Sequence, residues 1–174
     1  EAIYCLIQAQ LWDDAADLIE ELGVSRMLAG KNESLNWWLN RLPEHTITQR
    51  PKLALIKAWT LFCTERVTEA EPYLNQADQL LQGTDHAALR TQILVFRAHI
   101  ARFRGDEENA AHWSALAMKQ SAAQAQDLNA VTLFAMGLEQ YQNGQTHHTR
   151  TYMEQALSAA YREQNYFCAL SVSI

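Results

Sequence analysis

The sequence predicts an all-α chain built from stacked helical hairpins, an α-α superhelix. Its 174 residues include 26 alanines and 22 leucines but only 13 valines and isoleucines, which favours helices over a large sheet. Glycine and proline, which interrupt helices, number only 6 and 3. A pattern of polar turn, acidic or polar residues and small apolar residues returns about every 40 residues, which is typical of helical repeats.

Each repeat is predicted to be two antiparallel helices, because apolar residues return every three or four positions on both sides of a short turn. The predicted first helices are 53–62, 93–103 and 131–141, and the second helices are 69–81, 106–118 and 149–161. Small residues that let helices approach closely lie at Ala58, Ala98 and Gly137 on first helices, and at Ala77, Ala117 and Ala156 on second helices. One hairpin cannot cover its own apolar face, so neighbouring hairpins are expected to stack.

We expect a single domain over residues 1–174, with hairpins at 1–22, 51–83, 86–122 and 127–163. Residues 23–50 break the rhythm and are predicted to hold one or two inserted helices. There, Gly23 interrupts the pattern, a helix capped by Asn32 or Ser34 runs to Leu42, and 44–50 is a polar loop. Residues 165–174 are expected to begin a further, truncated helix, so the chain reads as a piece of a longer protein.

Charge and cysteine content narrow the classes of function. The net charge of −6 argues against non-specific binding to nucleic acid, which depends on lysine and arginine. Three cysteines without a CxxC pair, and no signal peptide at the start of the sequence, favour the reducing cytoplasm. No apolar run reaches the roughly 20 residues that span a bilayer, so we expect no membrane association.

Two parts of the sequence resemble a known family. The hairpins resemble tetratricopeptide repeats, lengthened from the usual length of about 34 residues. More specifically, Trp12 to Glu20, Trp37-Trp38-Leu39-Asn40-Arg41-Leu42-Pro43, and the segments 50–59 and 69–74 are similar to the start of the repeat region in MalT-like, ATP-dependent transcriptional regulators of the LuxR class. The chain departs from the repeat pattern at Lys57 and Arg97, where repeat helices usually carry an apolar residue.

The resemblance implies a function in signalling. In such regulators, a helical solenoid follows a nucleotide-binding module and precedes a DNA-binding helix-turn-helix. This chain would then be the arm that binds a small-molecule inducer, a peptide or a protein and relays the event to ATPase and DNA-binding modules. It contains no phosphate-binding loop, so ATP and DNA would be partners of other domains only. We expect no enzyme activity and no cofactor, and self-association is possible. The alternative is a general tetratricopeptide scaffold or adaptor.

Candidate binding residues follow from the solenoid prediction, because first helices line the concave surface of such a stack. The groove candidates are Trp59, Gln92, His99, Arg102 and Tyr141. Arg102 with His99, one turn earlier, could take a carboxylate or a phosphate, since a guanidinium group matches forked anions. Under the competing interpretation, Arg102 only complements the negative end of its helix.

Other polar groups are given structural roles. His147 and His148 point about 100° apart on a helix and lack a metal-ligand frame, so we expect exposed histidines and no metal site. The acidic pairs Asp13-Asp14 and Glu107-Glu108 are expected at helix starts. Trp37 and Trp38 cannot share one face, so one should pack inward and the other toward a neighbouring helix or partner. No group that could activate a thiol is identified, and burial is expected for Cys5, Cys63 and Cys168.

Overall fold

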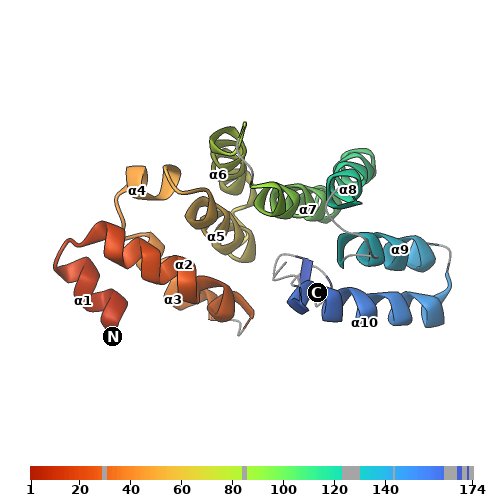
Figure 1. The fold of residues 1–174 in the computed structure, drawn as a ribbon, viewed down its shortest axis with the longest axis horizontal. Helices are drawn as coiled ribbons and strands as arrows, with labels where there is room; N and C mark the ends of the chain where they lie inside the picture. Colours follow the sequence, from red (N-terminus) through yellow and green to blue (C-terminus); the bar gives the residue numbers. More distant parts are fainter. Residues whose placement is uncertain are drawn as a thin grey trace. The chain divides into compact units, whose positions relative to one another are not determined.

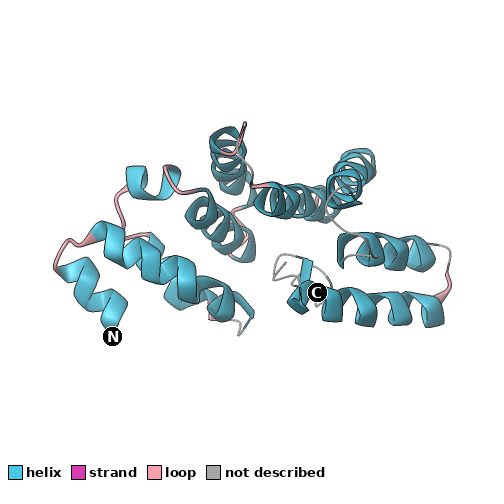
Figure 2. Cartoon of the chain, in the orientation of Figure 1, coloured by secondary structure: helices cyan, strands magenta, loops and turns pink. Residues whose placement is uncertain are grey.

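The structure is a computed structural model that describes residues 1–28, 31–83, 86–122, 130–142, 144–162, 168–169 and 172. Every element within these residues is a helix, and none is a strand (Figures 1 and 2). The prediction of an all-α chain is therefore confirmed, whereas the superhelical arrangement of the repeats stays a prediction. The chain forms two compact units, Glu1–Asp85 (unit 1) and His86–Ile174 (unit 2).

Unit 1 is built around one central helix. Its helices are α1 (Ala2–Gln8), α2 (Trp12–Leu28), α3 (Asn32–Leu39), α4 (Glu44–Thr48), α5 (Pro51–Cys63) and α6 (Val67–Leu80). Four of them, α2, α3, α4 and α6, contact α5. Residues 53–61 of α5 are consequently all buried, including both faces of the helix. The core of unit 1 is thus α5 and the apolar stripes of the helices that surround it.

Unit 2 consists of two helical hairpins. Its helices are α7 (Ala87–Phe103), α8 (Glu107–Ala122), α9 (Ala130–Gln142) and α10 (Thr146–Arg162). Helix α7 pairs with α8, α9 pairs with α10, and α8 contacts α9 (Figure 1). The described helices of these hairpins span 87–122 and 130–162, within the predicted ranges 86–122 and 127–163. Both halves of each hairpin carry the helical apolar period in their own sequence.

One backbone turn is repeated at four hairpins and provides local evidence for a repeat. The second residue after the end of the first helix has a positive φ in each case: 56° at Gln10, 60° at Glu65, 74° at Gly105 and 72° at Gly144. The following N–H donates to the carbonyl five residues back, over 2.9–3.0 Å, in the bonds Leu11→Leu6, Arg66→Leu61, Asp106→Ala101 and Gln145→Gln140. This is the Schellman motif, which satisfies carbonyls at a helix end. Since the last three turns lie 40 and 39 residues apart, they repeat with the period predicted from the alanines.

The predicted small residues lie where helices meet. Ala58, Ala77, Ala98, Ala117 and Ala156 are all buried. Ala117 of α8 packs with Val95 of α7 in a cluster that also contacts Leu94 and Met118. At Gly137, an added Cβ would lie 2.9 Å from Cε of Met153, so Met153 of α10 packs directly against the backbone of α9 and would have to shift for a larger residue. The assignment of these positions to helix contacts is therefore confirmed at Ala117 and Gly137.

Residues 23–50 differ from the prediction at four points, one of which is that the helix expected to run to Leu42 ends at Leu39. Helix α2 continues through Gly23 to Leu28. A Cβ added at Gly23 would lie 2.9 Å from Cδ1 of Ile56, so α2 and α5 are close together at this residue. Asn32 is the first residue of α3, and the cap position is Lys31. The predicted loop 44–50 contains helix α4, which starts after Pro43. The two inserted helices, α3 and α4, are as predicted in number.

Lys57 and Arg97, the two departures from the repeat pattern, are accommodated by specific partners. Lys57 is 6% exposed, and its Nζ donates to Oδ1 of Asn40 over 2.6 Å. Burial lowers the pKa of this ammonium group, against the attraction of Glu44. The guanidinium of Arg97 lies 4.9 Å from the ring centroid of Trp113. Lys57 is thus buried with a polar partner, whereas Arg97 is half-buried against an aromatic ring.

Candidate ligand-binding site

The five predicted groove residues do not form one site within either unit. Trp59 belongs to unit 1, whereas Gln92, His99, Arg102 and Tyr141 belong to unit 2. Trp59 is 2% exposed, and its ring lies 5.7 Å from that of Phe62. The indole is a core residue of unit 1 and presents no surface to a ligand there, because α5 is packed against by α2, α3, α4 and α6.

In unit 2, three of the predicted residues share one face of α7. Gln92, His99 and Arg102 follow one another at i, i+7 and i+10, which places them along a single side of a helix. All three side chains are half-buried. Tyr141 stands apart at the end of α9 and is 68% exposed. The structure therefore supports a line of polar residues on α7, with Tyr141 outside it.

Arg102 lies where three helices of unit 2 converge. Its Nη2 donates to Oγ of Ser114 on α8 over 2.7 Å. Its guanidinium also lies 5.9 Å from the ring centroid of Phe134 on α9. Neither Ser114 nor Phe134 was predicted as part of a site. The sequence offered one indication of this contact. Ser114 is a polar residue one turn before Ala117, on the side of α8 that the structure shows to be buried at Ala117.

The charge of Arg102 is only partly compensated. Among the described residues no carboxylate forms an ion pair with it, and its hydrogen-bond partner is a neutral hydroxyl. Burial lowers the pKa of Arg102, and the more distant Glu107 opposes this effect. An arginine remains protonated at neutral pH in proteins. The site is thus a half-buried cation held in place by α8 and α9, which favours an incoming anion.

His99 adds an uncharged imidazole one turn before Arg102. Burial first, and then the positive charge of Arg102, lower the pKa of His99 to about 4. The ring is consequently neutral at pH 7, so one nitrogen can donate and the other accept a hydrogen bond. Together, Arg102 and His99 can bind a carboxylate or phosphate but do not form a nucleophile–base pair for catalysis.

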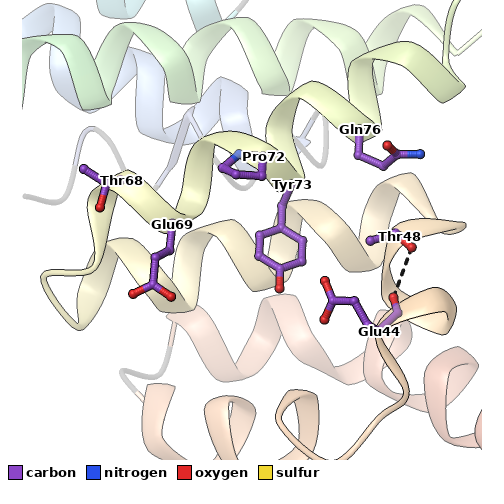
Figure 3. A pocket seen from close by; sticks show the side chains of 7 residues that line it. All are labelled: Glu44, Thr48, Thr68, Glu69, Pro72, Tyr73 and Gln76. Carbon is purple, nitrogen blue, oxygen red and sulfur yellow. Dashed lines mark hydrogen bonds between the residues drawn. The ribbon is translucent and has the colours of Figure 1, made fainter.

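A second cleft lies in unit 1, between α4 and α6 (Figure 3). It has a volume of about 460 Å³ and is lined by Glu44, Thr48, Thr68, Glu69, Pro72, Tyr73 and Gln76. The sequence did not reveal it, because its α4 wall falls within the segment predicted to be a loop. Arg66 donates two hydrogen bonds to the Glu69 carboxylate, over 2.6 and 2.7 Å, which lowers the pKa of that carboxyl.

The acidic residues at helix starts have the structural roles that were predicted. Asp13 and Asp14 lie in the first turn of α2, and Glu107 and Glu108 in that of α8. Oδ1 of Asp106 accepts the backbone N–H of Asn109 over 3.2 Å, as an N-cap does.

Histidine and tryptophan side chains follow the predictions in part. His147 and His148 are both exposed, as expected. Trp37 and Trp38 are each half-buried, so neither packs fully inward. Trp37 stacks on Tyr4 and under the guanidinium of Arg41, at 5.6 and 3.6 Å between centres, while Arg26 lies over Trp38 at 5.4 Å. Within the described part of the chain, no three histidine, cysteine or acidic side chains group as metal ligands would.

The cysteines correct one prediction. Cys168 is buried as expected, but Cys5 and Cys63 are exposed, because each occupies the outward side of its helix. Neighbouring atoms still shield the Cys63 sulfur, and this burial raises the pKa of the thiol to about 11. A thiol with such a pKa is a poor nucleophile at neutral pH.

The described residues include no helix of sufficient length and apolarity to span a bilayer. No protein-family model matches this chain. No solved structure matches it either.

Proposed function

We propose that this chain is the ligand-sensing helical-repeat arm of a MalT-like, LuxR-class transcriptional regulator, and that unit 2 binds the anionic group of an inducer or partner at Arg102. The single observation behind the binding site is the half-buried Arg102 guanidinium, which makes no ion pair among the described residues. His99 lies beside it as a neutral hydrogen-bonding group. The regulator assignment is supported by the resemblance of residues 12–74 to that family.

The proposed role is binding without chemistry. A ligand can shift the parent protein between inactive and active states only if it binds one state more tightly than the other. Arg102 suits such coupling because it contacts both α8 and α9, so an anion that attracts the guanidinium also acts on the contacts with Ser114 and Phe134. ATP and DNA would bind to other domains of the parent protein, in the cytoplasm.

The test compares ligands that differ in charge alone. Sugars and sugar phosphates, and aromatic acids with their amides, would be screened by thermal shift and the hits measured by calorimetry. We expect the anionic member of a pair to bind and Arg102→Gln to weaken it about tenfold or more, since a hydrogen bond to a charged group contributes about 1.5–3 kcal/mol. Arg104→Gln is the matched control, because Arg104 is an exposed cation two residues away. Equal affinity of wild type and Arg102→Gln would overturn the site.

The second candidate is a general tetratricopeptide scaffold, which the repeated hairpin turns at Glu65, Gly105 and Gly144 favour equally. The sequence of the parent protein separates the two candidates. A nucleotide-binding module before this chain and a helix-turn-helix after it are expected for the regulator. Their absence from the parent would leave the scaffold as the better proposal.

A further inference from the structure

The cleft between α4 and α6 of unit 1 is not used by the proposed function, and its lining has a definite chemistry. Its charged groups are the Glu44 and Glu69 carboxylates, and the Thr48, Thr68, Tyr73 and Gln76 side chains add neutral groups that can donate or accept hydrogen bonds. No lysine, arginine or histidine lines it. In Figure 3 the Tyr73 ring lies between Glu44 and Glu69, and the Tyr73 hydroxyl points toward the Glu44 carboxylate.

Glu44 is the carboxylate that remains available for a ligand. Within the described residues it makes no ion pair, and its polar side-chain partner is the neutral hydroxyl of Tyr73. Burial, followed by this hydrogen bond, raises the pKa of Tyr73 to about 12, so the hydroxyl stays protonated. Two cations lie near the cleft: Lys57 donates to Asn40 and attracts Glu44 without an ion pair, and Arg66 donates to Glu69.

The walls of the cleft suit a side chain with an apolar stem and a charged end. The ring of Tyr73 and the ring of Pro72 offer apolar surface next to the carboxylates (Figure 3). An aromatic face also attracts cations directly. Glu44, Thr68, Glu69 and Pro72 are exposed, so the cleft is open to solvent and accessible to a side chain that projects from a protein surface. Its volume of about 460 Å³ is within the range of ligand sites.

We propose that this cleft binds an arginine or lysine side chain presented by a partner peptide, with the cation on Glu44 and its stem against Tyr73 and Pro72. A small free amine could supply the same cation, and the open cleft favours the peptide because little of an isolated ligand would be covered. This site is independent of Arg102 in unit 2, which attracts the opposite charge.

The experiment titrates the chain with three capped tripeptides of the form Gly-X-Gly, in which X is arginine, lysine or citrulline. Citrulline keeps the shape of arginine but lacks its charge. Binding would be followed by amide NMR shifts of α4 and α6. We expect the arginine and lysine peptides to bind and the citrulline peptide to bind about tenfold more weakly. Added salt should weaken the charged peptides only.

Matched variants locate the site. Glu44→Gln should reduce affinity for the arginine peptide about tenfold, and Tyr73→Leu should reduce it for both charged peptides. Glu71→Gln, which removes an exposed carboxylate of α6 that does not line the cleft, should leave binding unchanged. Thermal melts of each variant show that the fold is intact. Equal binding of the citrulline and arginine peptides, unchanged binding by Glu44→Gln, or binding of free agmatine without either charged peptide would overturn the proposal.

Discussion

Helices α5 and α7 each form the first helix of a hairpin, yet they are buried to very different extents. Residues 53–61 of α5 are buried without interruption. In α7 buried residues alternate with half-buried ones, and the half-buried ones include Gln92, His99 and Arg102. Both helices have the same turn after them and a small residue, Ala58 or Ala98, at the helix contact.

The difference arises from the inserted helices. In unit 1, α2, α3 and α4 pack against α5 in addition to its own partner α6, so every side of α5 is covered. In unit 2, the described helix that pairs with α7 is α8. The short helices α3 and α4 therefore help to make α5 the centre of a core.

The largest expected effect compares Trp59 and Tyr141, two residues that the sequence assigned to the same groove. Trp59→Ala should reduce the free energy of unfolding by about 3–5 kcal/mol, because it removes a buried aromatic side chain. Tyr141→Ala should change it by less than about 0.5 kcal/mol, since that ring is mostly exposed. Guanidinium denaturation followed by circular dichroism measures both. Similar costs for the two variants would contradict the contrast between the units.

A smaller effect is expected in how the stability of the two units depends on pH. The folded pKa of His99 is about 4 and its unfolded value is 6.5, so between these values the unfolded chain binds more protons. The contribution of His99 to the free energy of unfolding is complete above pH 6.5. It should decrease by about 2–3 kcal/mol as the pH drops toward 4. The loss should appear in denaturation curves of wild type measured across this range and be smaller in His99→Gln.

Glu20 of unit 1 is the counterpart for this test. Burial is the main cause of the raised pKa of Glu20, so the folded state binds a proton more readily than the unfolded chain. The contribution of Glu20 to the free energy of unfolding therefore increases as the pH falls, which is opposite to that of His99. Glu20→Gln should therefore not flatten the loss of stability at low pH. If that variant removed the pH dependence while His99→Gln retained it, the assignment to unit 2 would be wrong.

The smallest expected effect concerns the turn that both units share. Glu65 has a φ of 60°, and Glu65→Gly should stabilise unit 1 by about 0.5–1 kcal/mol, because a side chain is strained in this conformation. Gly105→Ala should destabilise unit 2 by about 1 kcal/mol. No atom lies within 4 Å of a Cβ added at Gly105, so that cost would be conformational alone. Thermal melts measure both changes in stability. If both substitutions stabilised the fold, or both destabilised it, the turns at Glu65 and Gly105 would differ in energy.

The candidate sites were predictable only in part. Arg102 and His99 were found because their spacing places them on one face of a first helix, a property of local sequence. Their partners Ser114 and Phe134 come from other helices and were missed. The cleft at Glu44 and Tyr73 was missed because α4 is a five-residue helix without a clear apolar period. Trp59, Cys5 and Cys63 were misjudged because burial depends on which distant segments cover a residue.

The sequence by itself determined the helices, the hairpin turns and the period of about 40 residues, because helix formation depends on neighbours three or four positions away. Only the tertiary structure decided which helix faces remain open. At Gly23 the missing side chain leaves room for Ile56 of α5, a close approach of residues far apart in the chain. Long-range packing of this kind buries α5 in unit 1, whereas Arg102 of α7 in unit 2 is half-buried.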